Sequence, residues 1–174
     1  MSAYRLGRPA KAKGRHPNAI CGLFTSELRL FESSLLMVKI EIEYTGDLHS
    51  EAVHTQSGTR LQTDAPLDNG ARGESFSPTD LVATALGTCM TTTMDLYAKR
   101  NGFNIDGTKA VVVKHMTSTP VRRIERLEVV VSIPLPANHP ERATLEKIAL
   151  NCPVQKSLNP EMEMPVTFSW GDDL

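Results

Sequence analysis

Two cysteines of this chain could act together in redox chemistry. Cys89 and Cys152 stand 63 residues apart in the sequence. Chemistry with peroxides needs one thiolate that attacks oxygen to give a sulfenic acid, and a second thiol that condenses with it before over-oxidation. A pair of cysteines is therefore sufficient for peroxide reduction, provided that the fold brings the two sulfur atoms together.

Each thiol also has a plainer interpretation, because a single cysteine on an apolar stripe usually packs as a small buried hydrophobe. The surroundings of Cys152 favour reactivity. Pro153 is expected to begin a helix, so the Cys152 sulfur would lie near unpaired backbone N–H groups and the positive end of the helix dipole, which favours a thiolate. Lys156, one turn later, adds positive charge.

The spacing of possible metal ligands predicts no metal site. The sequence has no CxxC, no histidine pair at i and i+4, and no Cys/His cluster at zinc spacing. We therefore expect the cysteines to work without a bound metal.

Cys89 lies within the strongest helix signal of the chain. Ser77 is the expected N-cap, Pro78 the first helical residue and Asp80 the third residue of a capping box. The helix is predicted to run to about Asn101, with Gly102 as its stop. The apolar positions at spacings of three and four, which predict a mostly buried stripe, are Leu81, Val82, Ala85, Leu86, Cys89, Thr93, Leu96 and Tyr97.

Three strands are expected before this helix. Residues 38–44 alternate apolar and polar side chains, which is typical of a strand with one face in water. Residues 48–54 and 60–64 are its predicted partners in an antiparallel meander, and the glycine- and proline-containing residues 65–74 are a predicted loop.

Three more strands and a broken helix are expected after it. Residues 109–116 and 124–134 have continuous valine cores, which predict strands covered on both faces. A helix should begin at Pro140, break at Cys152 and restart at Pro153, before a last strand over 165–170. The predicted fold is α+β, in the order β-β-β-α-β-β-α-β with a long central helix.

Composition indicates one soluble domain. The chain has 174 residues, 19 Lys and Arg against 20 Asp and Glu, and a formal net charge of −1. The basic footprint of a nucleic-acid-binding protein is missing, and no apolar run approaches the roughly 20 residues of a membrane span. We therefore expect a cytoplasmic protein that contacts neither nucleic acid nor membrane.

Residues 1–36 differ from the rest of the chain. They carry six Lys or Arg against two Glu, which gives this segment a net charge of +4 and the remainder −5. The segment lacks hydrophobic periodicity, so we expect a disordered or adventitious extension. A mitochondrial address is the alternative. Translation could also begin at Met37, and residues 37–174 are the predicted domain.

Both cysteine segments resemble one family. Residues 76–89, FSPTDLVATALGTC, resemble the central-helix signature of the OsmC/Ohr family, and residues 151–158, NCPVQKSL, resemble its second-cysteine motif. The similarity extends in order from Met37 to Trp170. It includes residues 54–58, 63–66 and 166–170.

The resemblance implies an OsmC-like fold, an intertwined homodimer with two active sites at the subunit interface, and reduction of small organic or fatty-acid hydroperoxides. By the same resemblance, Cys89 is the peroxidatic cysteine and Cys152 the resolving one. An external dithiol or lipoyl-type reductant would reduce the Cys89–Cys152 disulfide, and no bound cofactor is implied.

One position departs from the family pattern. Well-characterised members have a glutamate directly after the helix-starting proline, paired with an arginine that lowers the pKa of the cysteine, whereas this chain has Thr79. Asp80 either substitutes for that glutamate or serves only the capping box. Arg60 and Arg72 are the candidates for the arginine, and each is otherwise a solvated surface charge.

Two further side chains, Glu74 and His54, could orient a thiol, although either could equally be an ordinary polar residue.

Two functions other than peroxide reduction stay open. The chain could be a dimer that binds a hydrophobic ligand and has inert cysteines, or a redox sensor whose disulfide changes a partner surface.

Overall fold

The computed structural model describes residues 37–171. They fall into two compact units, residues 37–41 with 53–59 and residues 42–52 with 60–171. The predictions for residues 1–36 lie outside the described residues. No helix in the described part of the chain is long and apolar enough to cross a membrane.

The first three strands form a small sheet in the order β1-β2-β3. They are β1 (Ile40–Gly46), β2 (His49–His54) and β3 (Arg60–Thr63). The turn between β1 and β2 consists of Asp47 and Leu48, both at positive φ, and β1 ends at Gly46 with φ 99°, a backbone conformation that glycine adopts without steric cost. A short 3-10 helix, η1 (Leu67–Asn69), lies in the predicted loop.

The strand β1 has no buried face. Ile40, Ile42 and Tyr44, its alternating apolar residues, are 49%, 71% and 65% exposed. The alternation correctly predicted a strand, but the expectation that only one face meets water is wrong within this chain.

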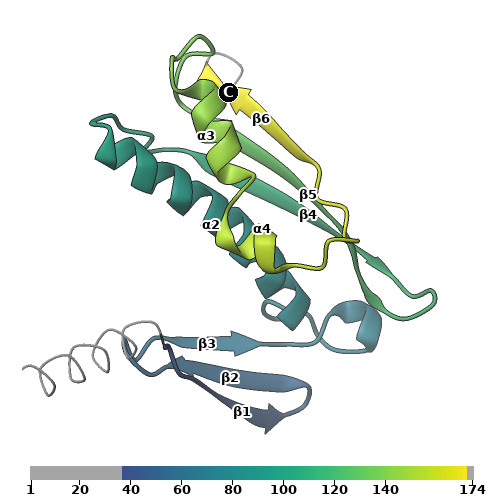
Figure 1. Ribbon diagram of the computed structural model, residues 1–174. Coiled ribbons are helices and arrows are strands. Elements are labelled where there is room, and N and C mark those ends of the chain that lie inside the picture. The colour runs from purple at the N-terminus through teal and green to yellow at the C-terminus, as the bar shows by residue number, and fades with distance from the viewer. Residues whose placement is uncertain (1–36, 172–174) are drawn as a thin grey trace, which may run out of the picture. The chain divides into compact units, whose positions relative to one another are not determined.

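The remaining elements form a helix-covered sheet (Figure 1). Its members are α2 (Pro78–Arg100), β4 (Lys109–Thr117), β5 (Arg123–Ile133), α3 (Arg142–Ala149), α4 (Pro153–Ser157) and β6 (Val166–Trp170). The strand order is β4-β5-β6, with β4 antiparallel and β6 parallel to β5. The mixed α+β class is as predicted. The helix α3, which was expected to begin at Pro140, begins at Arg142.

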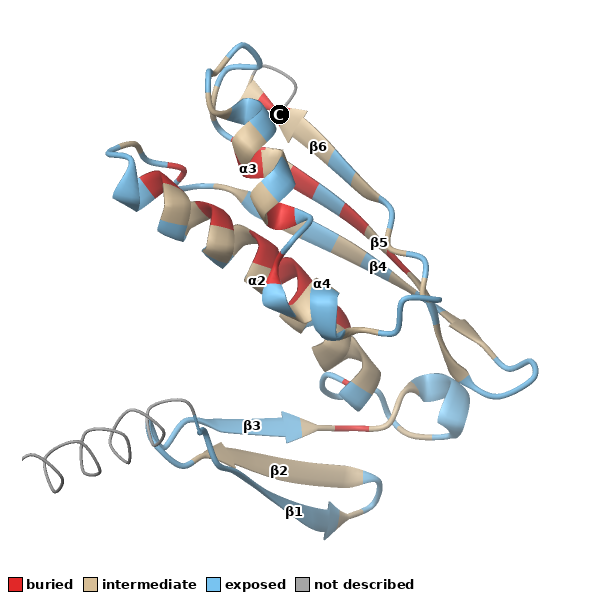
Figure 2. Cartoon of the chain, in the orientation of Figure 1, coloured by how far each residue is buried: buried red, intermediate tan, exposed pale blue. Residues whose placement is uncertain are grey.

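The core lies between α2 and one face of this sheet (Figure 2). Alternate residues of β5, from Leu127 to Ile133, are fully buried, as are Leu86, Met90 and Met94 of α2. The residues of β5 that are fully buried are Leu127, Val129, Val131 and Ile133.

The sheet is covered on one face, not on both as its valine runs predicted. Val111 and Val113 of β4 are 60% and 49% exposed, and Val130 of β5 is 37% exposed. The helix α2 packs on the face opposite to these side chains. Among residues 37–171, the hydrophobic core lies only on the sheet face that α2 covers.

The central helix begins as predicted. Ser77 is the N-cap, its side chain accepts a hydrogen bond from the Asp80 N–H, and the Asp80 side chain accepts one from the Ser77 N–H. The helix ends at Arg100, followed by the cap residue Asn101 and by Gly102 at φ 76°.

The buried face of α2 differs from the predicted stripe. It is formed by Ala83, Leu86, Gly87, Met90, Met94 and Ala98, whereas Leu96 is 50% exposed. Gly87 explains the difference, because a Cβ atom there would lie 3.0 Å from Cγ2 of Val112. The small residues of α2 allow it to approach β4 closely, and this approach decides which face is buried.

Candidate functional site

The thiols of Cys89 and Cys152 are neighbours. Cys89 lies in the middle of α2, half-buried and packed against the core, and Cys152 is the N-cap of α4 with a residue exposure of 1%. Both thiols are free, and the Cys89 side chain lies close enough to Cys152 to raise the pKa of the Cys152 thiol. The chain therefore brings together the two cysteines that its sequence singled out.

Pro153 positions Cys152 as expected. Cys152 has extended backbone, Pro153 is the first residue of α4, and the Gln155 N–H donates a hydrogen bond of 3.4 Å to the Cys152 sulfur. The helix start thus turns a backbone donor toward the thiol.

The prediction of a thiolate at Cys152 is wrong, however. Burial raises the pKa of Cys152 above its ordinary value, and the neighbouring Cys89 thiol raises it further. The Gln155 N–H acts in the opposite direction but is outweighed, and Lys156 is exposed. Cys152 consequently keeps its proton at neutral pH, and Cys89 is the more accessible sulfur.

A second polar cluster lies at the start of α2. The Lys114 ammonium group donates hydrogen bonds to Asp80 Oδ1 at 2.6 Å and to Thr79 Oγ1 at 2.7 Å. The Ser77 N–H donates to Asp80 Oδ2 at 2.8 Å. Burial opposes ionisation of Asp80, but the hydrogen bonds from Lys114 and Ser77 outweigh it and hold the pKa of Asp80 below its ordinary value.

The Asp80 carboxylate serves the helix cap and Lys114. Asp80 is nine residues before Cys89, so the helical rise separates them by about 13.5 Å along the axis. Within one chain Asp80 therefore does not touch the thiols, and neither does Thr79 one residue earlier.

Lys114 is the cation of this cluster, and sequence reasoning missed it. Its signal lies in the alternation of β4, where Ala110, Val112 and Lys114 share the face turned toward α2. A lysine in phase with partly buried apolar residues usually has an anionic partner, which is here Asp80.

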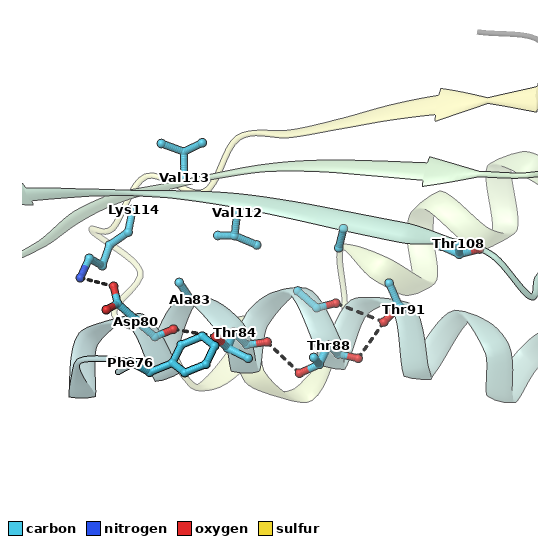
Figure 3. A pocket seen from close by; sticks show the side chains of 12 residues that line it. Phe76, Asp80, Ala83, Thr84, Thr88, Thr91, Thr108, Val112, Val113 and Lys114 are labelled. Atoms are coloured by element: carbon cyan, nitrogen blue, oxygen red, sulfur yellow. Dashed lines mark hydrogen bonds and ion pairs between the residues drawn. The ribbon is translucent and has the colours of Figure 1, made fainter. Parts of the chain in front are cut away.

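A groove of about 680 Å³ runs between α2 and β4, with Lys114 and Asp80 at one end (Figure 3). Thr84, Thr88 and Thr91 form much of its helical wall. Their hydroxyls donate to carbonyls of the preceding helical turn, so these three side chains offer their methyl groups to the groove.

The thiols do not line this groove. Cys89 follows Thr88, which does, and successive helical residues are rotated by about 100°. The groove and the cysteine pair thus lie on different sides of α2, and α4 covers the side of the cysteines.

The remaining candidates have other partners. Arg60 forms an ion pair with Glu51. His54 Nδ1 forms a hydrogen bond of 2.7 Å with Ser57 Oγ in the turn after β2. Glu74 lies 3.6 Å from His49 Nε2, measured from its Oε2.

The second arginine candidate, Arg72, lies beside Glu74, with 3.5 Å between Arg72 Nε and Glu74 Oε1. In the contacts described for residues 37–171, neither Arg60 nor Arg72 takes the activating place beside a thiol that the family pattern implies.

A family model for OsmC-like proteins matches residues 71–167. A crystal structure from Psychrobacter arcticus 273-4, named for osmotic stress induction and a detoxification response, is 37% identical in sequence. The match covers 76% of this chain and 96% of that one, with a TM-score of 0.71.

Two more distant structures share the fold. An organic hydroperoxide resistance protein OsmC of Legionella pneumophila is 15% identical over 76% of this chain and 96% of that chain, with a TM-score of 0.63. The organic hydroperoxide resistance protein of Elizabethkingia anophelis is 17% identical over 76% and 96%, with a TM-score of 0.60. A search of curated proteins finds no significant match.

Proposed function

This chain belongs to the OsmC-like protein family, and from that premise we propose that it reduces organic hydroperoxides with the thiols of Cys89 and Cys152. The observation that carries the proposal is the adjacency of these two free thiols, one half-buried and one fully buried. Structures with the same fold bear the name organic hydroperoxide resistance protein, which supports the choice of substrate class.

The different surroundings of the two thiols give them different roles. Cys89 is the accessible sulfur, so its thiolate attacks the outer oxygen of the hydroperoxide, breaks the O–O bond and becomes a sulfenic acid, while the alkoxide leaves and takes a proton as the alcohol. Cys152 is buried and protonated, so it does not itself attack the hydroperoxide.

Cys152 then resolves the intermediate. Its sulfur attacks the Cys89 sulfenic acid, a disulfide forms and the hydroxyl leaves as water. The Gln155 N–H that points at the Cys152 sulfur stabilises the thiolate during this step. An external dithiol, lipoyl-type in the family pattern, returns the disulfide to two thiols by exchange.

The cluster of Thr79, Asp80 and Lys114 does not activate Cys89 within one chain, because the helical rise separates them. The proposed activity is therefore that of a peroxidase without the glutamate–arginine pair of the family pattern. We expect slower oxidation of Cys89 than in members that have this pair.

We also propose that the chain works as a homodimer. Ile42 of β1 and Val111 of β4 are 71% and 60% exposed, and large exposed apolar side chains on two strands are typical of surfaces that a partner covers. Sedimentation equilibrium at micromolar concentration tests this, and a monomer at all concentrations would contradict it.

A steady-state assay tests the peroxidase. The reduced full-length protein is supplied with a lipoyl dithiol and with either cumene hydroperoxide or hydrogen peroxide. We expect sustained turnover with the organic substrate and a lower kcat/KM with hydrogen peroxide. Cys21→Ser is the matched control, since it removes the third cysteine and keeps the proposed pair. Turnover that is lost in Cys21→Ser, or absent in the parent protein, would refute the proposal.

The groove between α2 and β4 supports a second candidate, the binding of a small apolar ligand. Its volume of about 680 Å³ lies within the usual range for small-molecule sites, and Ala83, Thr84 and Val112 in its lining carry methyl groups. Binding of an uncharged alkyl alcohol by isothermal titration calorimetry, weakened when Thr88→Trp fills the groove, would favour this function. Binding that is equal in both proteins would exclude it.

A further inference from the structure

Three residues outside the thiol pair and the groove converge on one point. His49 begins β2, Asp64 follows β3, and Glu74 precedes the segment that leads into α2. One ligand atom from each residue lies within 4.8 Å of the others. Local sequence spacing predicted no metal site, and it could not detect this group, because its members come from three separate segments.

Asp64 is the buried member of the group. The residue is 1% exposed, the Glu74 N–H donates to its Oδ2 at 2.9 Å, and its Oδ1 is buried without a hydrogen-bond partner. A buried carboxylate oxygen without a partner costs free energy unless a cation or donor meets it. This oxygen faces His49, with 3.6 Å between Asp64 Oδ1 and His49 Nε2.

The imidazole of His49 is oriented for the same point. Its Nδ1 lies 2.8 Å from the Asp47 carbonyl oxygen, which can only accept a hydrogen bond, so Nδ1 carries the proton. In the neutral ring the lone pair is then on Nε2, directed at Asp64 and Glu74. A backbone carbonyl that fixes the tautomer of a histidine in this way is the usual outer support of a metal ligand.

The distances fit ligands of one ion better than hydrogen bonds. His49 Nε2 lies 3.6 Å from both Asp64 Oδ1 and Glu74 Oε2, too far for a good hydrogen bond to either. Ligands at the usual 2.0–2.2 Å from a tetrahedral ion lie roughly 3.3–3.6 Å apart. The other oxygen of Glu74 is directed at Arg72, which helps to orient this exposed side chain.

From this geometry we propose that His49, Asp64 and Glu74 bind a divalent transition-metal ion of the zinc type. One imidazole nitrogen and two carboxylate oxygens suit such an ion and disfavour Mg²⁺ and Ca²⁺, which prefer oxygen ligands alone. The site is independent of the proposed peroxidase function.

The test is metal binding to the full-length protein. Isothermal titration calorimetry with Zn²⁺ is expected to show one site per chain, with at least about a hundredfold loss of affinity in His49→Gln and in Glu74→Gln. The matched control is His115→Gln, because His115 lies 3.7 Å from Glu128 without a third ligand. Equal affinity in His49→Gln and the parent protein, or equal affinity for Zn²⁺ and Mg²⁺, would overturn the proposal.

A spectroscopic probe separates this site from the cysteines. Co²⁺ bound by His49, Asp64 and Glu74 gives the visible bands of a nitrogen- and oxygen-ligated tetrahedral ion, without a sulfur-to-metal charge-transfer band. Such a band on the single tight ion would show thiolate ligation and contradict the proposal. Circular dichroism of each variant confirms that it folds, and NMR of His49 gives a second readout, because Zn²⁺ is expected to shift Nε2 more than Nδ1.

Discussion

The helix α2 carries two polar centres, Cys89 with Cys152 at its middle and Asp80 with Ser77 and Lys114 at its start. The two centres differ in the interactions that set their protonation. At the middle of the helix, Cys89 meets Cys152 in a buried setting where few hydrogen bonds act and burial sets the proton affinity. At the start of the helix, Asp80 is held by Ser77 and Lys114, and hydrogen bonds overcome burial. One helix thus separates the groups suited to reaction from the groups that fix its own start.

The largest expected effect falls on the cysteine centre alone. Made in the Cys21→Ser protein, Cys89→Ser should lower the rate of oxidation by cumene hydroperoxide by at least about a thousandfold, because only the buried Cys152 thiol remains. Stopped-flow loss of hydroperoxide measures the rate, with Cys21→Ser as control. A Cys89→Ser protein that still consumes peroxide at the parental rate would show that the centre is misassigned.

The second prediction divides the roles of the two thiols. In the Cys152→Ser protein, Cys89 should be oxidised in the first turnover at a rate within roughly threefold of that in the parent protein. The reaction should then stop at the Cys89 sulfenic acid, which excess peroxide over-oxidises. Intact-mass analysis detects the added oxygen atoms. A first oxidation abolished by Cys152→Ser would instead make the buried thiol the attacking one.

At the start of the helix we expect an effect on stability. Asp80→Asn removes a charge-assisted capping interaction, so the free energy of unfolding should fall by about 1 kcal/mol, while the first oxidation of Cys89 changes little. Urea denaturation measures stability and stopped-flow measures oxidation. A large loss of oxidation rate in a variant that remains folded would show that the two centres are coupled.

The smallest expected effect is the pH dependence of the stability that Asp80→Asn loses. Because the pKa of Asp80 is lowered in the folded state, its carboxylate contributes stability above the ordinary carboxyl value of 3.8 and loses the contribution as pH falls through the folded pKa. The stability difference between the parent protein and Asp80→Asn should therefore be constant near neutral pH and shrink in acid. Urea midpoints across pH measure it, and a difference that grows in acid would have the wrong sign.

Local signals predicted the features that depend on neighbours in sequence. The capping box at Ser77, the stop at Gly102 and the break before Pro153 are all confirmed. These features depend on backbone donors within one turn of the residue, so the sequence alone determines them.

Features that depend on distant segments were predicted less well. The valine runs of β4 and β5 gave no indication that one sheet face stays exposed, and the buried face of α2 followed from its close approach at Gly87. The prediction of a thiolate at Cys152 is wrong because burial raises the pKa of this thiol more than the backbone donors at the helix start lower it. Lys114 escaped notice because its partner Asp80 is 34 residues away.

The most direct test of the central claim is a nonreducing peptide map of the fully reduced protein after one equivalent of cumene hydroperoxide. We expect rapid formation of a Cys89–Cys152 disulfide, and slower formation of this disulfide with hydrogen peroxide. Free thiols at both positions after the organic hydroperoxide has been added would show that the pair does not reduce peroxides.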